Sequence, residues 1–324
     1  MKFAVPGHPK SGFLWEQKVI KILAGCGWSS VEGWCGVFVH ADGSIYILYV
    51  DDFMLVASDK KAREHWTTLG RAVEFSEEAA PILRYLGAMY HLDQQAAGAA
   101  LTSRRLVVEM ENYILNLVRR FEQDWGKQVP KVTSPFPTEQ ANDAGSFEPG
   151  RSQESCASYV ATILFAARVC RADCMTAVQR LCTQVSRWTA ADDEALIRLM
   201  GYLKYNATIA IAGELGPDDV HNLEIRVWTD ADWNGDPNTS KSTSGLFIEL
   251  VAPKSGRTFP LIWKTGLQTS TGTSSAETET VSLATGLRQE GLPIQELLEV
   301  LIGRRLWLRC KVDNTQAIAA AKKG

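Results

Sequence analysis

The sequence lacks any apolar stretch long enough to cross a membrane. Its longest apolar run, Ile45 to Val50, falls far short of the roughly 20 residues that a spanning helix needs. The first residues, Met1 to Gly12, also lack the apolar segment of a secretory signal peptide. We therefore expect an intracellular protein, cytoplasmic or nuclear, with no membrane partner. Hydrophobic residues are 45% and charged residues 22% of the 324, as in an ordinary globular chain.

The cysteines and histidines show no familiar metal-binding or disulfide pattern. No CxxC pair occurs among the seven cysteines, and the five histidines are scattered. The sequence therefore favours neither a zinc site nor a disulfide framework. Free cysteine packs as a small hydrophobic side chain. On that ground we interpret three cysteines near helical spacing as buried, inert thiols: Cys170, Cys174 and Cys182.

The chain also lacks a basic excess and the glycine-rich motifs that hold nucleotides. Its formal net charge is −3, whereas proteins that hold nucleic acid through bulk charge are usually basic. Any binding of nucleic acid must then depend on local patches and on metal ions. Neither a GxGxxG nor a Walker motif is present, which disfavours a small-molecule α/β enzyme with a phosphate loop.

Three regions follow one another along the chain. Residues 1–150 mix helical and strand patterns and end in a linker rich in proline, glycine and small polar residues. Residues 151–222 are mostly helical, with a capping box at Thr189 to Asp192 and a loop at Gly213 to Asp219. Residues 223–324 show three strands, then helix, strand and helix. This order predicts an α+β or α/β fold with a mixed sheet flanked by helices.

Apolar residues from Leu106 to Phe121 recur at three- and four-residue spacing, which predicts an amphipathic helix. Arginines are expected at both ends of this helix. These arginines are Arg104, Arg105, Arg119 and Arg120. They either belong to a solvent-exposed helix surface or contact the phosphates of a template–primer duplex.

Two adjacent aspartates, Asp51 and Asp52, separate the apolar runs Ile45 to Val50 and Phe53 to Ala57. The pattern predicts a hairpin with two carboxylates at its tip. Such a pair is either a solvent-exposed turn or a ligand pair for divalent cations. Cations would relieve the repulsion between the carboxylates and could serve phosphoryl transfer.

The segment Tyr49-Val50-Asp51-Asp52 resembles the YVDD signature of copia-type LTR-retrotransposon reverse transcriptases. The resemblance extends to segments similar to that family's pre-hairpin segment, LxYLG hairpin, thumb helix and helical connection: Pro6 to Gly12, Leu83 to Gly87, Tyr113 to Phe121 and residues 156–212. Arg171-Ala172-Asp173 departs from the family's usual Arg-Pro-Asp. The resemblance implies a partial palm and thumb, with the family's third metal-binding aspartate upstream of residue 1. We therefore expect DNA polymerisation to be lost.

A second acidic set is Asp230, Glu279 and Asp313. Adjacent strands of a mixed sheet can bring Asp230 and Asp313 together, and the helix that begins near Ala276 can add one glutamate. Glu277 and Glu279 cannot both face the sheet, because two residues turn a helix by about 200°. Glu279 lies on the side of the helix that carries leucines and small residues, which should pack on the sheet. We therefore predict that Glu279, and not Glu277, is the metal ligand. Three converging carboxylates suit Mg²⁺ or Mn²⁺ and the hydrolysis of a phosphodiester.

Residues 225–321 also resemble the RNase H domain of copia-type Pol polyproteins, in TDADWNGDPNTSKSTSGLFIEL, IWKTGLQTSTGTSSAETET and KVDNTQAIAAA. The resemblance implies that Asp230, Glu279 and Asp313 are the first three metal ligands. Asp232 and Asp236 are expected on the surface near the site. A turn that leads into a strand is formed by Lys241, Ser242, Thr243 and Ser244. Its hydroxyls and amides either contact phosphate or only stabilise the turn.

The expected function is hydrolysis of the RNA strand of RNA–DNA hybrids with Mg²⁺ or Mn²⁺, the rest of a Pol polyprotein being a further partner. The family's further acidic residue and histidine would lie beyond Gly324, so weak activity is expected. The alternative is a catalytically inactive mobile-element remnant that at most binds nucleic acid.

Pro293 should end or kink the preceding helix near Leu292.

Overall fold

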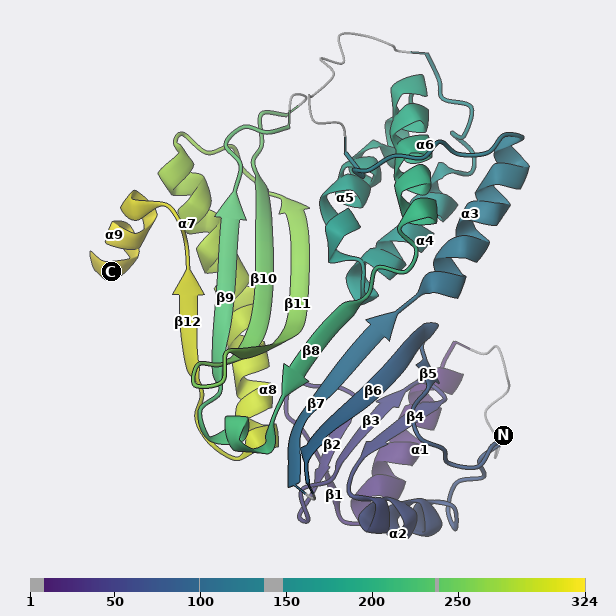
Figure 1. Cartoon of the computed structure of the whole chain (residues 1–324), viewed down its shortest axis with the longest axis vertical. Coiled ribbons are helices and arrows are strands. Elements are labelled where there is room, and N and C mark those ends of the chain that lie inside the picture. The colour runs from purple at the N-terminus through teal and green to yellow at the C-terminus, as the bar shows by residue number, and fades with distance from the viewer. Residues whose placement is uncertain (1–8, 99, 137–147, 237–238, 324) are drawn as a thin grey trace. The chain divides into compact units, whose positions relative to one another are not determined.

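The computed structural model describes residues 9–98, 100–136, 148–236 and 239–323. The chain is α+β and divides into two compact units (Figure 1). One comprises Met1–Ile82 with Leu292–Leu306, and the other Leu83–Gly291 with Trp307–Gly324. No helix among the described residues is long and apolar enough to span a membrane. Residues 137–147 of the predicted linker, and the start of the segment Pro6 to Gly12, lie outside the described residues.

The first unit contains an antiparallel sheet in the order β1-β2-β3-β4. Its core joins apolar side chains of the sheet and two helices, with Trp28 and Tyr46 at the centre. Apolar and exposed residues alternate along the strands because one face of the sheet is buried. The elements are α1 (Ser11–Gly25), β1 (Trp28–Ser30), β2 (Val37–His40), β3 (Ile45–Tyr49), β4 (Asp52–Val56), α2 (Asp59–Leu69) and α8 (Leu292–Ile302).

The predicted hairpin at the paired aspartates is confirmed, but its turn lies one residue earlier. Tyr49 pairs with Asp52, so Asp52 opens β4 and the two turn residues are Val50 and Asp51. Val50 has a φ of 54°, a left-handed conformation that is unusual for a β-branched residue.

The second unit contains a sheet in the order β5-β6-β7-β8, which corrects two predictions. Leu106, Arg104 and Arg105 lie in a strand and not in the helix, which begins only at Glu111. Residues 211–215, expected partly as loop, form an edge strand that pairs with β7. Both errors have one cause, since pairing between distant segments overrides local spacing. The strands are β5 (Arg84–Tyr85), β6 (Ala88–Ala97), β7 (Ala100–Glu109) and β8 (Ile211–Leu215).

Helices of the second unit share one apolar core, which includes the fully buried Trp188. The predicted capping box is confirmed, because the Asp192 carboxylate accepts from the Thr189 backbone N–H at 2.8 Å. Cys170 and Cys174 are buried as expected, whereas Cys182 is only partly buried. Burial raises the pKa of the Cys170 thiol to about 12. The helices are α3 (Glu111–Trp125), α4 (Cys156–Val169), α5 (Met175–Gln184) and α6 (Ala190–Tyr205).

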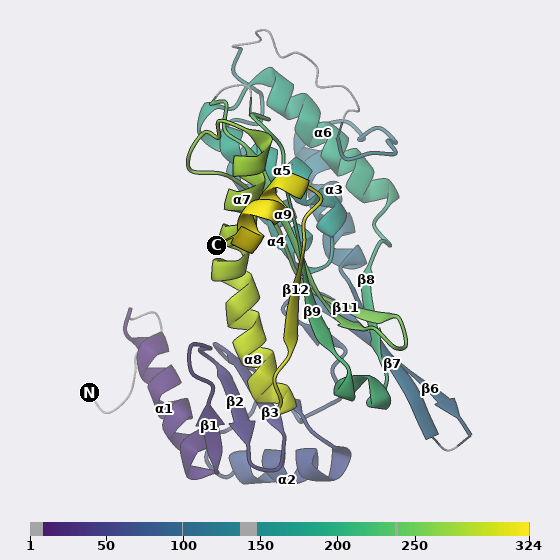
Figure 2. The same cartoon turned by 90° about the vertical axis from the view of Figure 1, so that its left-hand side faces the viewer.

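The third sheet has the order β11-β10-β9-β12, with β9, β10 and β11 antiparallel and β12 parallel to β9. Figure 2 shows α7 running beside these strands, where it packs against β9 and β10. Before Pro293 the regular helix gives way to a π-helical turn at Leu287–Gly291, as the proline predicts. The elements are β9 (Glu224–Ala231), β10 (Thr243–Ala252), β11 (Arg257–Leu267), α7 (Ser275–Gly286), β12 (Trp307–Lys311) and α9 (Thr315–Lys323).

A buried ion pair fixes the turn between α4 and α5. The Arg171 side chain is fully buried and donates to the Asp173 carboxylate at 2.7 Å. The Tyr202 hydroxyl of α6 donates to the same carboxylate at 2.8 Å. Burial opposes the ionisation of Asp173, yet Arg171 and Tyr202 hold its pKa below the usual value. The pair therefore ties three helical segments together.

We predict that Asp173→Ala lowers the free energy of unfolding by about 3–5 kcal/mol, because it leaves the buried Arg171 cation without its carboxylate. Urea unfolding measures this loss. The exposed Asp218→Ala should change stability by less than about 0.5 kcal/mol. The double change Arg171→Met with Asp173→Leu should recover part of the loss. Equal stability of Asp173→Ala and Asp218→Ala would contradict this role.

Candidate metal centre

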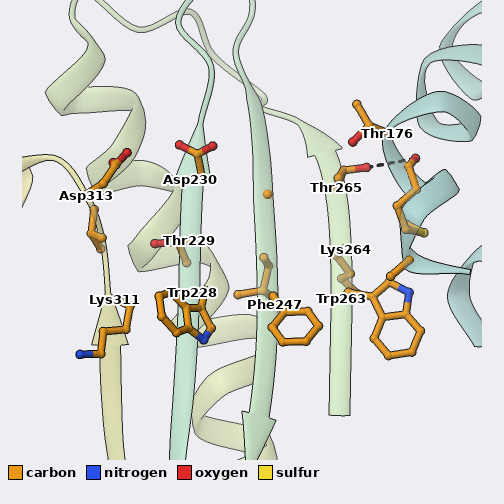
Figure 3. A pocket seen from close by; sticks show the side chains of 15 residues that line it. Thr176, Trp228, Thr229, Asp230, Phe247, Trp263, Lys264, Thr265, Lys311 and Asp313 are labelled. Atoms are coloured by element: carbon orange, nitrogen blue, oxygen red, sulfur yellow. Dashed lines mark hydrogen bonds between the residues drawn. The ribbon is translucent and has the colours of Figure 1, made fainter. Parts of the chain in front are cut away.

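Three carboxylates from distant parts of the sequence meet at one edge of the third sheet. Asp230 lies near the end of β9, Asp313 follows β12, and Glu279 lies in α7. One ligand atom from each residue lies within 4.8 Å of the other two. Figure 3 shows the Asp230 and Asp313 side chains next to each other at the ends of their strands. The structure thus brings together the three acidic residues that the sequence selected.

Strand register brings the two aspartates together. Cys310 and Lys311 of β12 pair with Val227 and Trp228 of β9, in parallel. Continuing this register by two residues sets Asp313 beside Asp230. Because the strands are parallel, both chains leave the sheet at the same edge, where their carboxylates are exposed.

Local capping decides which glutamate faces the sheet. The Ser274 side chain caps α7 by accepting from the Glu277 backbone N–H. Glu277 in turn accepts from the Thr273 backbone N–H and hydroxyl, at 2.7 and 2.6 Å, and stays exposed. Glu279 is only 5% exposed and points toward the two aspartates.

Close packing of α7 on the sheet holds Glu279 in place. The Ser282 hydroxyl donates to the Asp230 carbonyl at 3.0 Å. At Gly286 an added Cβ would lie 3.0 Å from Leu246 Cδ1 and 3.4 Å from Thr229 Cγ2. A larger residue there would push the helix away from the sheet, so glycine permits the short approach that the centre needs.

The electrostatics of the cluster favour a cation. Burial raises the pKa of Glu279 to about 7, and the charges of Asp230 and Asp313 add to this rise, while the Ala231 backbone N–H opposes it. Glu279 Oε2 is buried and receives no hydrogen bond from any described residue. Oxygen ligands grouped in this way suit a hard divalent cation such as Mg²⁺ or Mn²⁺. The residues present therefore fit such an ion.

A cavity of about 550 Å³ adjoins Asp230 and Asp313. Trp228 lies two residues before Asp230 on the same face of β9, and Phe247 and Trp263 continue the apolar surface across the sheet (Figure 3). The exposed Lys311 adds positive charge at its rim, whereas the ammonium of Lys264, which also lines the cavity, is paired with the Glu290 carboxylate. Sequence reasoning missed these residues, although strand alternation in Trp228-Thr229-Asp230 would have placed the tryptophan on the side of the aspartate.

The cavity is closed on one side by the helical part of the same unit. The Trp263 indole N–H donates to the Ala167 carbonyl at 2.7 Å. The Thr265 hydroxyl donates to the Met175 carbonyl at 3.4 Å (Figure 3). Met175 opens α5 and lines the cavity with Thr176. These bonds connect β11 to α4 and α5.

The other predicted site residues do not belong to this three-carboxylate cluster. Asp51 and Asp52 are exposed at the β3–β4 turn, and no third ligand-type side chain joins them within the described ranges. Arg104 and Arg105 are exposed neighbours on β7 and therefore point to opposite faces.

The turn that leads into β10 uses its polar groups internally. Ser242 is fully buried, and its hydroxyl accepts from the Asn234 backbone N–H at 3.2 Å. Ser244 accepts from the Gln268 side chain at 2.9 Å, and the Thr243 backbone N–H donates to Asp232. Of the four residues predicted to contact phosphate, Lys241 is the one with a charged side chain, and it is half-buried.

Comparison with known proteins adds no family for this chain. No protein-family model matches it, and no curated protein matches it significantly.

We compare the free energy of unfolding of the wild-type protein with that of Glu279→Gln in chelator-treated buffer. We predict that the wild type becomes less stable relative to the variant by about 3 kcal/mol as the pH rises from about 4.5 to above 7. The folded-state pKa of about 7 exceeds the ordinary value of 4.5, so the protonated carboxyl stabilises the fold at low pH and this contribution disappears as the group ionises. Urea unfolding across the pH range measures the difference.

Glu277→Gln is the matched control, because this exposed residue lies two positions away on α7. It should leave the wild-type decline in place. A difference between wild type and Glu279→Gln that stays constant with pH would contradict the raised pKa.

Proposed function

We propose that this chain is a reverse transcriptase/RNase H segment of a copia-type Pol polyprotein, and that it hydrolyses the RNA strand of RNA–DNA hybrids with Mg²⁺ or Mn²⁺. The observation that carries the proposal is the convergence of Asp230, Glu279 and Asp313 within 4.8 Å. The order of elements along the chain supports it, because strands β9, β10 and β11, helix α7 and strand β12 follow one another as the resemblance leads us to expect.

Asp230, Glu279 and Asp313 would hold the metal. A bound divalent cation supplies a nucleophilic water and neutralises charge on the phosphodiester. Asp230 and Asp313 face solvent and leave room for a phosphate at the edge of the sheet. Glu279 approaches from α7, where burial limits its motion.

The cavity next to the aspartates suits a nucleic-acid strand. Trp228 is 42% exposed and offers a ring face for stacking on a base or sugar. Its indole N–H donates to Glu249 at 2.9 Å, which fixes the ring orientation. Lys311 is exposed on β12 two residues before Asp313, and it can pair with a phosphate. Recognition would then depend on local groups, as the net charge of −3 requires.

We predict that the wild-type protein cleaves the RNA strand of a labelled RNA–DNA hybrid with Mg²⁺ or Mn²⁺, and that Asp230→Asn lowers the rate by about 1000-fold. Loss of one metal ligand removes several kcal/mol of transition-state stabilisation, and each 1.36 kcal/mol is tenfold in rate. Gel analysis of the cleaved RNA measures the effect.

Glu277→Gln is the control for Asp230→Asn, and it should retain the wild-type rate within about twofold, since it removes an exposed carboxylate outside the cluster. A DNA duplex should not be cut. Absence of metal-dependent cleavage by the folded wild-type protein would favour the alternative, a catalytically inactive mobile-element remnant that at most binds nucleic acid.

We also predict that the purified chain does not extend a primer on an RNA template. Asp51 and Asp52 supply two carboxylates, and in the described part of the chain no third ligand completes a cluster with them. A two-metal site needs more ligands to neutralise the attacking and leaving oxygens. A primer-extension assay with Mg²⁺ or Mn²⁺ measures this, and incorporation that Asp51→Asn abolishes would refute the prediction.

A further inference from the structure

A second group of metal-ligand side chains lies in the first unit, away from any acidic motif. His40 ends β2, Asp42 lies in the turn before β3, and His65 lies in α2. His40 Nδ1 lies 3.0 Å from Asp42 Oδ1, and His65 Nε2 lies 3.0 Å from Asp42 Oδ2. One ligand atom from each residue lies within 4.8 Å of the other two.

The turn holds Asp42 in a defined orientation. The Ser44 backbone N–H donates to Asp42 Oδ1 at 2.9 Å, and the Gly43 backbone N–H donates to the His40 carbonyl at 2.9 Å. Gly43 has a φ of 85°, which favours glycine. The carboxylate is thus fixed by the backbone before any ligand binds.

Trp28 holds both imidazoles. Its ring centroid lies 5.2 Å from that of His40 and 4.8 Å from that of His65. The two imidazoles meet edge to face at 4.7 Å. Trp28 itself is only 3% exposed and belongs to the core of the first sheet. Packing against a rigid core therefore limits the motion of both histidines.

The spacing and chemistry of these atoms suit a transition-metal ion. Ligands of one zinc ion, with bonds of about 2.0–2.1 Å, lie roughly 3.0–3.4 Å apart. Two imidazoles with one carboxylate are a ligand set for zinc and neighbouring divalent ions.

We propose that His40, Asp42 and His65 form a zinc-binding site in which a fourth position stays open to water or an external ligand. The side chains are 24%, 26% and 12% exposed, so an ion can enter from solvent. The site does not depend on the function proposed for the Asp230 cluster, because the two clusters share no residue.

Lys61 is the group that competes with an ion. Its ammonium lies 3.8 Å from Asp42 Oδ2 and also donates to the Asp42 carbonyl. The side chain is 41% exposed, so it can swing into solvent at little cost. Without an ion, the histidines would serve only as hydrogen-bond partners of Asp42, and His40 Nδ1 would accept from the Asp42 backbone N–H at 3.3 Å. This is the outcome that the experiment must separate from metal binding.

The test is a titration of the chelator-treated, full-length chain with Zn²⁺, followed by calorimetry and metal analysis. Asp230→Asn should keep the histidine-dependent site. His65→Gln should weaken zinc binding by more than about 100-fold, since even the loss of an outer partner of a ligand costs about 10–100-fold. The double variant His91→Gln with His221→Gln is the matched control and should bind as the wild type does, because neither histidine belongs to the cluster.

Far-UV circular dichroism checks that each variant folds, and Asp42→Asn provides a second ligand variant. X-ray absorption of the zinc-loaded wild type provides a readout that needs no substitution and should show imidazole nitrogens on the metal. Zinc binding that His65→Gln and Asp42→Asn leave unchanged, or a zinc spectrum with oxygen ligands alone, would overturn the proposal. So would a wild-type chain that binds no zinc.

Discussion

The candidate metal centre depends on the parallel pairing of β12 with β9. This pairing joins residues more than 80 positions apart, Trp307 with Glu224 and Lys311 with Trp228. It sets Asp313 beside Asp230, and α7 then adds Glu279 from a third segment. A parallel pair cannot close through a tight turn, so the chain between the strands must cross over, and α7 lies in that crossover. The connection that joins the strands thus also delivers the third carboxylate.

Sequence reasoning succeeded where the signal is local. The Ser274 cap and helical rotation separate Glu277 from Glu279, and both follow from a few neighbouring residues. The capping box at Thr189 and the hairpin between β3 and β4 are of the same kind. All three acidic residues chosen from the last region came together, because strand ends and a helix start restrict where such side chains can point. Assigning Val50 to the turn required backbone angles, which side-chain type does not specify.

The failures concern contacts between distant segments. Residues 104–108 carry apolar spacing that a helix could use, yet they pair with β6 on one side and β8 on the other. Neither partner is visible in a local window. The grouping of His40, Asp42 and His65, on which the zinc proposal rests, was likewise not visible in the sequence, because these residues meet through a turn and a separate helix that no short motif encodes. The aromatic cavity beside Asp230 combines β9, β10, β11 and α5, so its extent also became visible only in the fold.

Charge explains why a cation must act before a polyanionic substrate can approach. Three carboxylates within 4.8 Å repel one another and any phosphate, and the net charge of −3 offers no compensating field. With a pKa of about 7, Glu279 is partly protonated and partly ionised near neutral pH when no metal is bound. A divalent ion would displace that proton, so metal affinity should increase with pH until Glu279 is ionised. A bound divalent ion would neutralise most of the negative charge of the three carboxylates, and Lys311 with the exposed ring of Trp228 could then hold the strand. Metal binding therefore precedes productive substrate binding in the proposed reaction.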